Sequence, residues 1–329
     1  MKVGIRADGG SKRGIGHLVR SGVLADRFLE EGYEVTYLTR TPGTVVDVCS
    51  SRVNTYELDA QHPQKDAIEW IENTGTEIVI SDCYDVDTAT QEAIAGVADC
   101  FVVIQVDDRH DLCCDILVNG NLFGPDVEYQ WQGSEPTWCV GIDYVLLQEK
   151  FQELAKQSPK YRSSPESALI TMGGSDVTNT TPTAMRAFNG YDLEIDVIIG
   201  PGYDNQEEIS TVASEISCQF DLIEDPPDLP ARMANADIAV SGFGTTAYEL
   251  LAAKTPFIGI PVVKNQKRSA QIFEKNKLAI VKYCKEDLVE GIQNMMCTPA
   301  TYHRFGEKYD SLIDGNGTEQ IFQEIQSQI

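Results

Sequence analysis

Short apolar runs and amphipathic stretches alternate along the whole chain. Apolar runs occur in the first half within 3–5, 35–38, 77–80, 101–104 and 116–118. Further runs occur in the second half within 168–170, 195–199, 237–240, 257–260 and 278–281. Continuous apolar runs separated by helical spacing are typical of strands that crossover helices bury on both faces. The pattern predicts an α/β protein with parallel sheets.

A polar segment with Ser-Pro steps separates the two series of runs, at 152–166. It predicts a linker near residue 160, so we expect two Rossmann-like domains, 1–160 and 161–329. The chain of 329 residues is long enough for two cores. We expect the last helix, about 318–327, to pack back across the junction. Because ligands of open parallel sheets bind beyond the carboxyl ends of strands, two such domains would enclose a cleft.

The charge balance narrows the choice of partners. Asp and Glu number 51 against 26 Lys and Arg, which gives a formal net charge of -25. Such a field repels phosphate at long range, so we expect neither nucleic acid nor an anionic membrane as a partner. A small anion can still be held by local dipoles. A saline habitat would also explain the acidity, and the sequence leaves the oligomeric state open.

Cysteine usage and hydropathy point to a reducing compartment. No stretch approaches the roughly 20 apolar residues that a membrane span needs, and the N-terminus lacks the apolar core of a signal peptide. The nine cysteines form no Cys-x-x-Cys pair. We therefore expect a cytoplasmic protein with free thiols, without disulfides or a zinc site.

The first candidate for chemistry is a glycine-rich loop between the strand that ends near Arg6 and a helix that opens at His17. The positive field at a helix N-terminus disfavours the protonated imidazole, so His17 is suited to act as a general base near neutral pH. Gly14 and Gly16 remove side chains where a substrate or water must approach. A tight turn with a capping imidazole is the purely structural alternative.

A second glycine loop follows the strand at 168–170. Gly173, Gly174, Ser175 and Asp176 lead into a predicted helix. Backbone N–H groups and the dipole of that helix would form an anion site suited to a diphosphate. An ordinary strand-to-helix turn is the alternative here.

A third loop, Gly242-Phe243-Gly244-Thr245-Thr246-Ala247, matches the dinucleotide fingerprint G-x-G-x-x-G/A. That fingerprint also requires an acidic residue at the end of the next strand, but 261–266 contains none. The missing acid weakens the interpretation that the loop binds a nicotinamide dinucleotide. It does not weaken the interpretation that Gly244 and Thr245 bind a nucleotide phosphate. Glu249, one turn into the helix, is a candidate to accept hydrogen bonds from ribose hydroxyls.

The segment Asp85-Val86-Asp87 resembles the Asp-x-Asp motif that holds a divalent metal in one class of glycosyltransferases. Its place directly before Thr88-Ala89-Thr90 is better explained by helix capping. We therefore assign no metal to the chain.

The loops together carry a spaced set of polar and glycine residues. The set comprises Arg6, Asp8, Gly14, Gly16, His17, Arg20, Asp82, Tyr84, Asp107, Asp108, Asn119, Asn121, Tyr144, Gly173, Gly174, Ser175, Asp176, Glu249 and 263–266. It resembles the UDP-sugar hydrolase family of pseudaminic acid biosynthesis, with relatives in spore-coat polysaccharide synthesis. The resemblance implies a GT-B fold, related to the GlcNAc transferase of peptidoglycan synthesis. Family members cleave UDP-2,4-diacetamido-2,4,6-trideoxy-β-L-altropyranose at the sugar C1–O bond, with water as acceptor and inversion.

The resemblance also implies roles for individual residues, with no metal and no other cofactor. His17 would be the base that activates water. The residues expected to bind the sugar part of the substrate are Arg6, Asp8, Gly14, Gly16, Arg20, Tyr84, Asp107, Asn119 and Tyr144. Those expected to bind UDP are Gly173, Gly174, Ser175, Asp176, Gly244, Thr245, Glu249, Asn265 and Gln266. Cys83 and Gln148 depart from the family pattern, where a histidine and an arginine often stand.

Three alternatives to hydrolysis stay open. A GT-B glycosyltransferase would pass the sugar of a UDP-sugar to an acceptor other than water, using the same base. A nicotinamide-dependent oxidoreductase would use Gly242, Gly244 and Ala247. A non-catalytic sensor would bind UDP-sugars and leave them intact.

Overall fold

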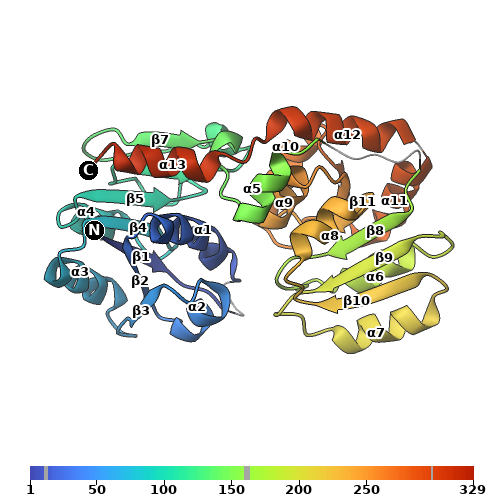
Figure 1. Cartoon of the computed structure of the whole chain (residues 1–329), viewed down its shortest axis with the longest axis horizontal. Helices are drawn as coiled ribbons and strands as arrows, with labels where there is room; N and C mark the ends of the chain where they lie inside the picture. The colour runs from blue at the N-terminus through green and yellow to red at the C-terminus, as the bar shows by residue number, and fades with distance from the viewer. Residues whose placement is uncertain (11–13, 159–163, 298) are drawn as a thin grey trace. The chain divides into compact units, whose positions relative to one another are not determined.

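The computed structural model describes residues 1–10, 14–158, 164–297 and 299–329. The chain forms two compact units (Figure 1), Met1–Gln148 with Asn316–Ile329, and Glu149–Gly315. The boundary predicted near residue 160 lies outside the described residues. Each unit is built around one sheet, and neighbouring strands pair in parallel throughout both sheets. The predicted class, α/β with two parallel sheets, is confirmed.

The sheet of the first unit has the order β3-β2-β1-β4-β5-β6-β7. Its strands are β1 (Lys2–Ala7), β2 (Glu34–Thr39), β3 (Asn54–Glu57), β4 (Ile78–Asp82), β5 (Cys100–Ile104), β6 (Ile116–Asn119) and β7 (Thr137–Val140). The buried runs of β1, β2, β4, β5 and β6 are the predicted ones. The edge strands β3 and β7 were not predicted, because edge strands are less buried and carry polar residues.

Helices cover this sheet, and the last helix of the chain is one of them. They are α1 (Gly16–Glu30), α2 (Pro42–Val48), α3 (Pro63–Thr74), α4 (Thr88–Ala95) and α13 (Gly317–Gln326), with short 3-10 helices at Gly124–Asp126 and Ile142–Tyr144. Ile321, Phe322 and Ile325 of α13 belong to the core of the first unit. Arg27 of α1 lies 4.1 Å over the Phe322 ring and binds Glu319. The last helix of the chain therefore completes the hydrophobic core of the first unit.

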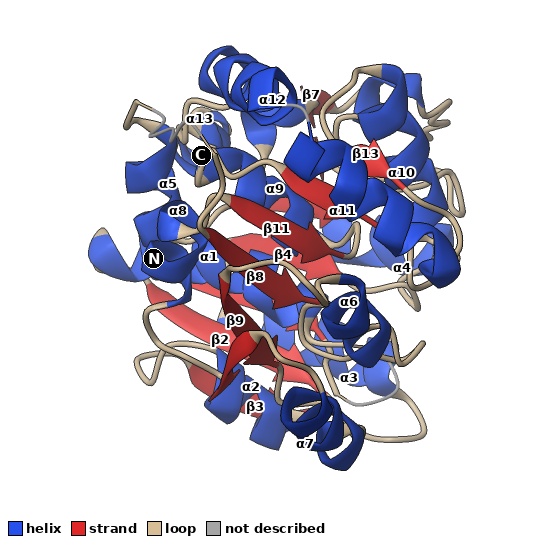
Figure 2. Ribbon diagram, turned by 90° about the vertical axis from the view of Figure 1, so that its right-hand side faces the viewer, coloured by secondary structure: helices blue, strands red, loops and turns tan. Residues whose placement is uncertain are grey.

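The sheet of the second unit has the order β10-β9-β8-β11-β12-β13. Its strands are β8 (Ser167–Thr171), β9 (Glu194–Ile199), β10 (Gln219–Glu224), β11 (Ile238–Ser241), β12 (Phe257–Gly259) and β13 (Ile280–Val281). The helices around these strands (Figure 2) are α5 (Glu149–Ala155), α6 (Thr181–Ala187), α7 (Gln206–Glu215), α8 (Leu229–Asn235), α9 (Thr245–Ala252), α10 (Gln266–Lys275), α11 (Leu288–Cys297) and α12 (Pro299–Leu312), with a 3-10 helix at Lys285–Asp287.

Both sheets reverse their strand order at the centre. In the first sheet the reversal lies between β1 and β4, and in the second between β8 and β11. The loops that leave the carboxyl ends of two such strands diverge, which makes this point the usual ligand site of an open α/β sheet. Each unit therefore places one pair of the predicted loops where a ligand can bind. No helix among the described residues is long and apolar enough to cross a membrane.

Candidate functional site

His17 lies at the start of α1, beside the carboxyl end of β4. The ring is 8% exposed, and its Nδ1 lies 2.6 Å from Oδ1 of Asp82, the last residue of β4. Parallel pairing sets Asp82 opposite Ala7, so the carboxylate lies next to the loop that leads from β1 into α1. The structure thus gives the predicted base a buried acidic partner.

Arg20, one turn further along α1, completes this group. Its Nε donates to Asp82 Oδ2 at 2.5 Å and its Nη2 to Oδ1 at 2.6 Å. Burial raises the pKa of Asp82, but the charge of Arg20 and the hydrogen bonds from His17 and Arg20 outweigh burial and hold that pKa below its ordinary value. An ionised carboxylate can only accept, so Nδ1 of His17 carries a hydrogen, and in the neutral form of the ring Nε2 then has the lone pair. A neutral imidazole held in this tautomer is a general base.

The role of Asp82 is what sequence reasoning missed. Asp82 belongs to the motif that carries the family resemblance, yet no function was assigned to it. Its position at the end of a buried strand was the available signal. A strand end identifies Asp82 as the partner of His17 only when β4 is known to pair with β1.

Two predicted substrate-binding residues, Arg6 and Asp8, are buried and bind each other. Arg6 Nη2 donates to Asp8 Oδ2 at 2.9 Å, and Asp8 also accepts from the backbone N–H and Nε of Arg40 at 2.8 and 2.9 Å. Burial raises the pKa of Asp8, but Arg6 and Arg40 hold it far below its ordinary value. Arg6 is 0% exposed and Asp8 3%. Direct contact of these two side chains with a ligand, as predicted, does not fit this burial.

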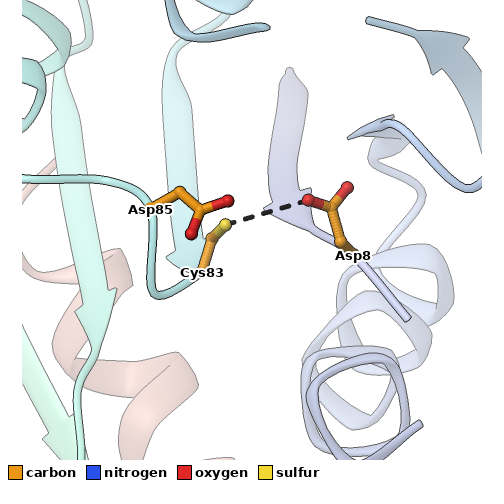
Figure 3. Close-up of side chains that lie close together, drawn as sticks. All are labelled: Asp8, Cys83 and Asp85. Atoms are coloured by element: carbon orange, nitrogen blue, oxygen red, sulfur yellow. Dashed lines mark hydrogen bonds between the residues drawn. The ribbon is translucent and has the colours of Figure 1, made fainter. Parts of the chain in front are cut away.

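One group among the described residues brings three potential metal ligands together, Asp8, Cys83 and Asp85 (Figure 3). Arg40 Nη2 lies 2.5 Å from Asp8 Oδ2 and 2.6 Å from Asp85 Oδ2, so a cation would have to compete with guanidinium groups for both carboxylates. Burial also raises the pKa of the Cys83 thiol, which disfavours the thiolate that metals bind. Asp87 caps α4 as predicted, accepting from the N–H of Thr90 at 2.9 Å.

Tyr84 follows directly and contacts the base. Its ring meets the His17 ring edge-on, with centroids 4.6 Å apart. The guanidinium carbon of Arg109 lies 3.6 Å from the Tyr84 centroid. Asp107, a predicted substrate ligand, binds Arg109 through Nε at 2.6 Å. The loop after β5 therefore contacts His17 indirectly, because its Arg109 lies over the Tyr84 ring.

The remaining residues of the first unit that were predicted to bind substrate differ in how exposed they are. Among the described residues, an added Cβ at Gly14 or Gly16 would meet no atom within 4 Å. Tyr144 is half-buried against the core. Asn119 is fully buried, and its Nδ2 donates to the Tyr129 hydroxyl at 2.8 Å. Asn119 thus holds the segment after β6 through this hydrogen bond. A buried side chain does not fit the predicted contact with a ligand.

In the second unit, Asp176 occupies the N-terminus of α6. Its carboxylate accepts from the N–H of Thr180 at 2.8 Å and of Thr181 at 2.7 Å, and from Asn205 Nδ2 at 3.1 Å. A diphosphate at this helix, as predicted, would have to displace the chain's own carboxylate from these two N–H groups. Asp176 itself is 3% exposed.

Gly200 and Gly202 allow the segment after β9 to approach the backbone of Gly173 and Gly174. Gly173 has a φ of +83°, and a Cβ on Gly200 would lie 2.4 Å from the Gly173 carbonyl oxygen. Gly202 N–H donates to the Gly174 carbonyl at 2.9 Å. A Cβ on Gly173 would lie 3.3 Å from Thr246 Oγ1, so this loop adjoins the start of α9. Ser175 is half-buried in the same loop.

The N-terminus of α9 differs from that of α6. Gly244 is its N-cap residue, no side chain caps it, and its first turn, which begins at Thr245, holds no acidic residue. Open N–H groups at such an end suit an anion. Burial raises the pKa of Glu249 to about 7, and among the described residues its side chain has no hydrogen-bond partner. A diphosphate at α9 with a ribose near Glu249 fits this arrangement.

Gln266 holds the loop that precedes α9. Its Oε1 accepts from the N–H of Phe243 at 3.1 Å and of Val262 at 2.9 Å. Phe243 is buried in turn, over Gly259, where a Cβ would lie 2.2 Å from its ring. The amide oxygen predicted to contact a ligand is therefore used internally, which leaves the Gln266 NH₂ group for a ligand. Asn265, the N-cap residue of α10, is exposed.

Comparison with solved structures identifies the class of fold. The chain superposes on MurG of Acinetobacter baumannii with a TM-score of 0.71, covering 99% of this chain and 100% of that one, at 12% identity. The fold belongs to the GT-B class, as expected. No family model matches the sequence.

Individual relatives are similar over most of the chain. The UDP-2,4-diacetamido-2,4,6-trideoxy-beta-L-altropyranose hydrolase of Campylobacter jejuni is 25% identical, over 82% of this chain and 95% of its own length. The spore coat polysaccharide biosynthesis protein SpsG of Bacillus subtilis is 22% identical, over 85% and 83%. An uncharacterized protein of Methanocaldococcus jannaschii is 22% identical over 99% of this chain, which spans 66% of that protein.

Proposed function

We propose that the chain hydrolyses a UDP-linked diacetamido-trideoxy sugar at the anomeric C1–O bond with inversion. The products are UDP and the free sugar, which would serve the biosynthesis of a nonulosonic acid of the pseudaminic type. The observation that carries the proposal is the buried pair His17–Asp82, with Nδ1 and Oδ1 at 2.6 Å and Nε2 left to accept a proton. The similarity to the C. jejuni hydrolase supports the substrate.

The proposed reaction is a single displacement. Nε2 of His17 takes a proton from water, and the water oxygen attacks C1 from the face opposite the diphosphate. The C1–O bond breaks with its electron pair going to the UDP oxygen, so the anomeric configuration inverts. Asp82 stabilises the imidazolium that forms, as a buried carboxylate does in hydrolase triads.

The proposal assigns each unit its own part of the UDP-sugar. In the first unit, Gly14 and Gly16 leave room beside the base, and Arg20, Tyr84 and Tyr144 contact the sugar. Arg6, Asp8, Asp107 and Asn119 hold these residues in place. Helix α9 begins in the second unit with no acidic residue in its first turn. Its N–H groups stabilise the charge that develops on the departing diphosphate.

The second unit holds UDP through side chains around α9. Glu249 accepts from the ribose hydroxyls. Gly173, Gly174 and Ser175 border the diphosphate beside Gly244 and Thr245. Asn265 and the Gln266 NH₂ group reach the diphosphate or the sugar. Asp176 stabilises α6 instead of binding UDP.

The test is UDP release from UDP-2,4-diacetamido-2,4,6-trideoxy-β-L-altropyranose without an acceptor and with EDTA, followed by NMR. Wild type should release UDP and the inverted sugar, and His17→Ala should not, while UDP affinity stays within about twofold. Asp82→Asn should lower kcat by about a thousandfold or more, because an amide no longer fixes the basic tautomer.

The outcomes separate the alternatives. Most of the activity remaining in His17→Ala would refute the assigned base. UDP binding without release would point to another sugar, or to a transferase that awaits its acceptor. Tighter binding of NADH than of UDP would favour the oxidoreductase.

A further inference from the structure

The ring that contacts the base is itself held by a residue outside the predicted site. Arg109, on the loop after β5, places its guanidinium carbon 3.6 Å from the centroid of Tyr84. The Tyr84 ring lies edge-on to His17 at 4.6 Å and 88°. A guanidinium over a tyrosine face is attracted by the ring quadrupole. Tyr84 is therefore in contact with both Arg109 and His17.

Arg109 has a fixed orientation. Asp107 accepts from its Nε at 2.6 Å, and a second hydrogen bond joins Nη2 to the other carboxylate oxygen. Such bidentate pairs fix the plane of the guanidinium, which a single bond to an ammonium would not do. The guanidinium that Asp107 orients is the one that lies over the Tyr84 ring.

Buried groups also fix the loop that carries Arg109. Gln105, 7% exposed, donates from Nε2 to the carbonyls of Asp107 and His110, both at 2.9 Å. The Tyr129 hydroxyl donates to the Gln105 carbonyl at 2.6 Å. His110 Nε2 lies 3.2 Å from the Tyr84 carbonyl oxygen, so the loop contacts the backbone of Tyr84 as well. The loop is thus built to hold Tyr84 in one place.

We propose that Arg109 is a positioning residue for the base and acts through Tyr84. The proposal rests on the function proposed above. Asp82 holds Nδ1 of His17 through a hydrogen bond. Tyr84, which Arg109 contacts on its face, limits how far the His17 ring can tilt. Nε2 is then aimed at one position for the attacking water. Small misplacements of a reacting group lower the rate of a step without weakening ground-state binding.

The first experiment compares steady-state kinetics of Arg109→Met with wild type. Methionine keeps an apolar stem and removes the guanidinium. We expect kcat to fall about tenfold, while KM and the UDP Kd stay within about twofold. Arg109→Lys, which keeps the charge but not the bidentate pair with Asp107, should recover only part of kcat. A rise in KM at unchanged kcat would mean that Arg109 binds the substrate directly, and would overturn the proposal.

A double-mutant cycle tests whether Arg109 acts through Tyr84. In a Tyr84→Leu background, Arg109→Met should cause no further loss of kcat, because the ring through which it acts is absent. In a Tyr84→Phe background, which keeps the ring, the loss should persist. Equal losses from Arg109→Met in wild type and in Tyr84→Leu would overturn the proposal.

An NMR measurement separates this proposal from the proposed function. His17→Gln identifies the His17 ring signals by their loss. Arg109→Met should shift those signals, because the neighbouring aromatic ring moves, while the thermal midpoint stays unchanged. Unmoved His17 signals would overturn the positioning role whether or not the sugar is hydrolysed. Shifted signals in a chain that hydrolyses no UDP-sugar would leave Arg109 as a positioning residue for this histidine and refute the proposed function alone.

Discussion

At the scale of single residues, each of two buried carboxylates at the edge of the first sheet binds two basic side chains. Asp8 binds Arg6 and Arg40, and Asp82 binds Arg20 and His17. Removing one partner of a buried pair leaves an uncompensated charge, which is strongly destabilising. In these two groups, Nε2 of His17 is the nitrogen that can accept a proton, because Nδ1 is the atom that contacts Asp82.

Glu249 is the contrasting case, a carboxyl whose pKa burial raises from 4.5 to about 7. Because the folded state favours its protonated form, stability falls as pH rises through the window between these values. We expect Glu249→Gln to raise the thermal midpoint at pH 8 and to leave it unchanged at pH 4. The same variant should weaken UDP binding about tenfold at pH 8, since a charged acceptor is lost.

Glu319 provides the matched control for Glu249. Arg27 lowers its pKa, so its ionised form stabilises the folded state above its ordinary pKa and the benefit is lost as pH falls. Glu319→Gln should therefore lower the midpoint at pH 8, with no effect on UDP binding. A midpoint that moves alike in both variants would contradict the assigned environment of Glu249.

The sequence predicted where polar residues gather but not which of them are free. Asp8, Asp107 and Asn119 follow strand ends, as the apolar runs predicted, yet each binds a residue of the same edge. Arg40, the partner of Asp8, directly follows β2, and the pairing of β1 with β2 is a long-range property of the sheet. Local spacing contains no information on such partners.

At the scale of elements, burial decides what was predictable. The central strands β4 and β5 are buried at every position and their apolar runs predicted them. Strands β3, β7 and β10 lie at sheet edges, and nearly all of their residues are half-buried or exposed. Their shorter, mixed sequences satisfy the strand pattern weakly.

The two helix starts of the second unit also could not be told apart from sequence. Both follow a glycine loop after a buried strand. Asp176 turns back onto the N–H groups of Thr180 and Thr181, because the positive φ of Asn179 (50°) lets the chain turn there. Helix α9 has no corresponding acid. Side-chain direction, which spacing does not specify, makes the difference.

Opposite substitutions at these two helix starts test the assignment of the anion site. Thr245→Glu places a carboxylate in the first turn of α9, which should stabilise the helix by about 0.3–1 kcal/mol and raise the UDP Kd more than about tenfold. Asp176→Ala should cost about 1 kcal/mol of unfolding free energy and leave the UDP Kd within about twofold. Calorimetry of UDP binding and thermal melts measure both. Loss of UDP binding only in Asp176→Ala would place the diphosphate at the loop after β8.

At the scale of the whole molecule, the net charge of -25 is carried largely by the surface. Arg6, Arg20 and Arg40 are bound to Asp8 and Asp82. Setting these three arginines and two carboxylates aside leaves 23 Lys and Arg against 49 Asp and Glu, so acids still outnumber bases about two to one. Surface charges interact through water and are screened by salt, whereas buried pairs are screened much less. Added salt should therefore relieve repulsion without weakening the site.

We expect KCl to raise the thermal midpoint steadily between 0.05 and about 1 M, because the Debye length falls from above 10 Å to about 3 Å over that range. The free energy of self-repulsion among the excess carboxylates falls with it. Sucrose at matched osmolality is the control for general exclusion from the surface and should raise the midpoint less. UDP release by wild type should persist at the higher salt concentrations, since Asp82 and His17 are buried and Arg20 is only partly exposed. A midpoint that KCl leaves unchanged, or lowers, would mean that the acidity does not limit the stability of this fold.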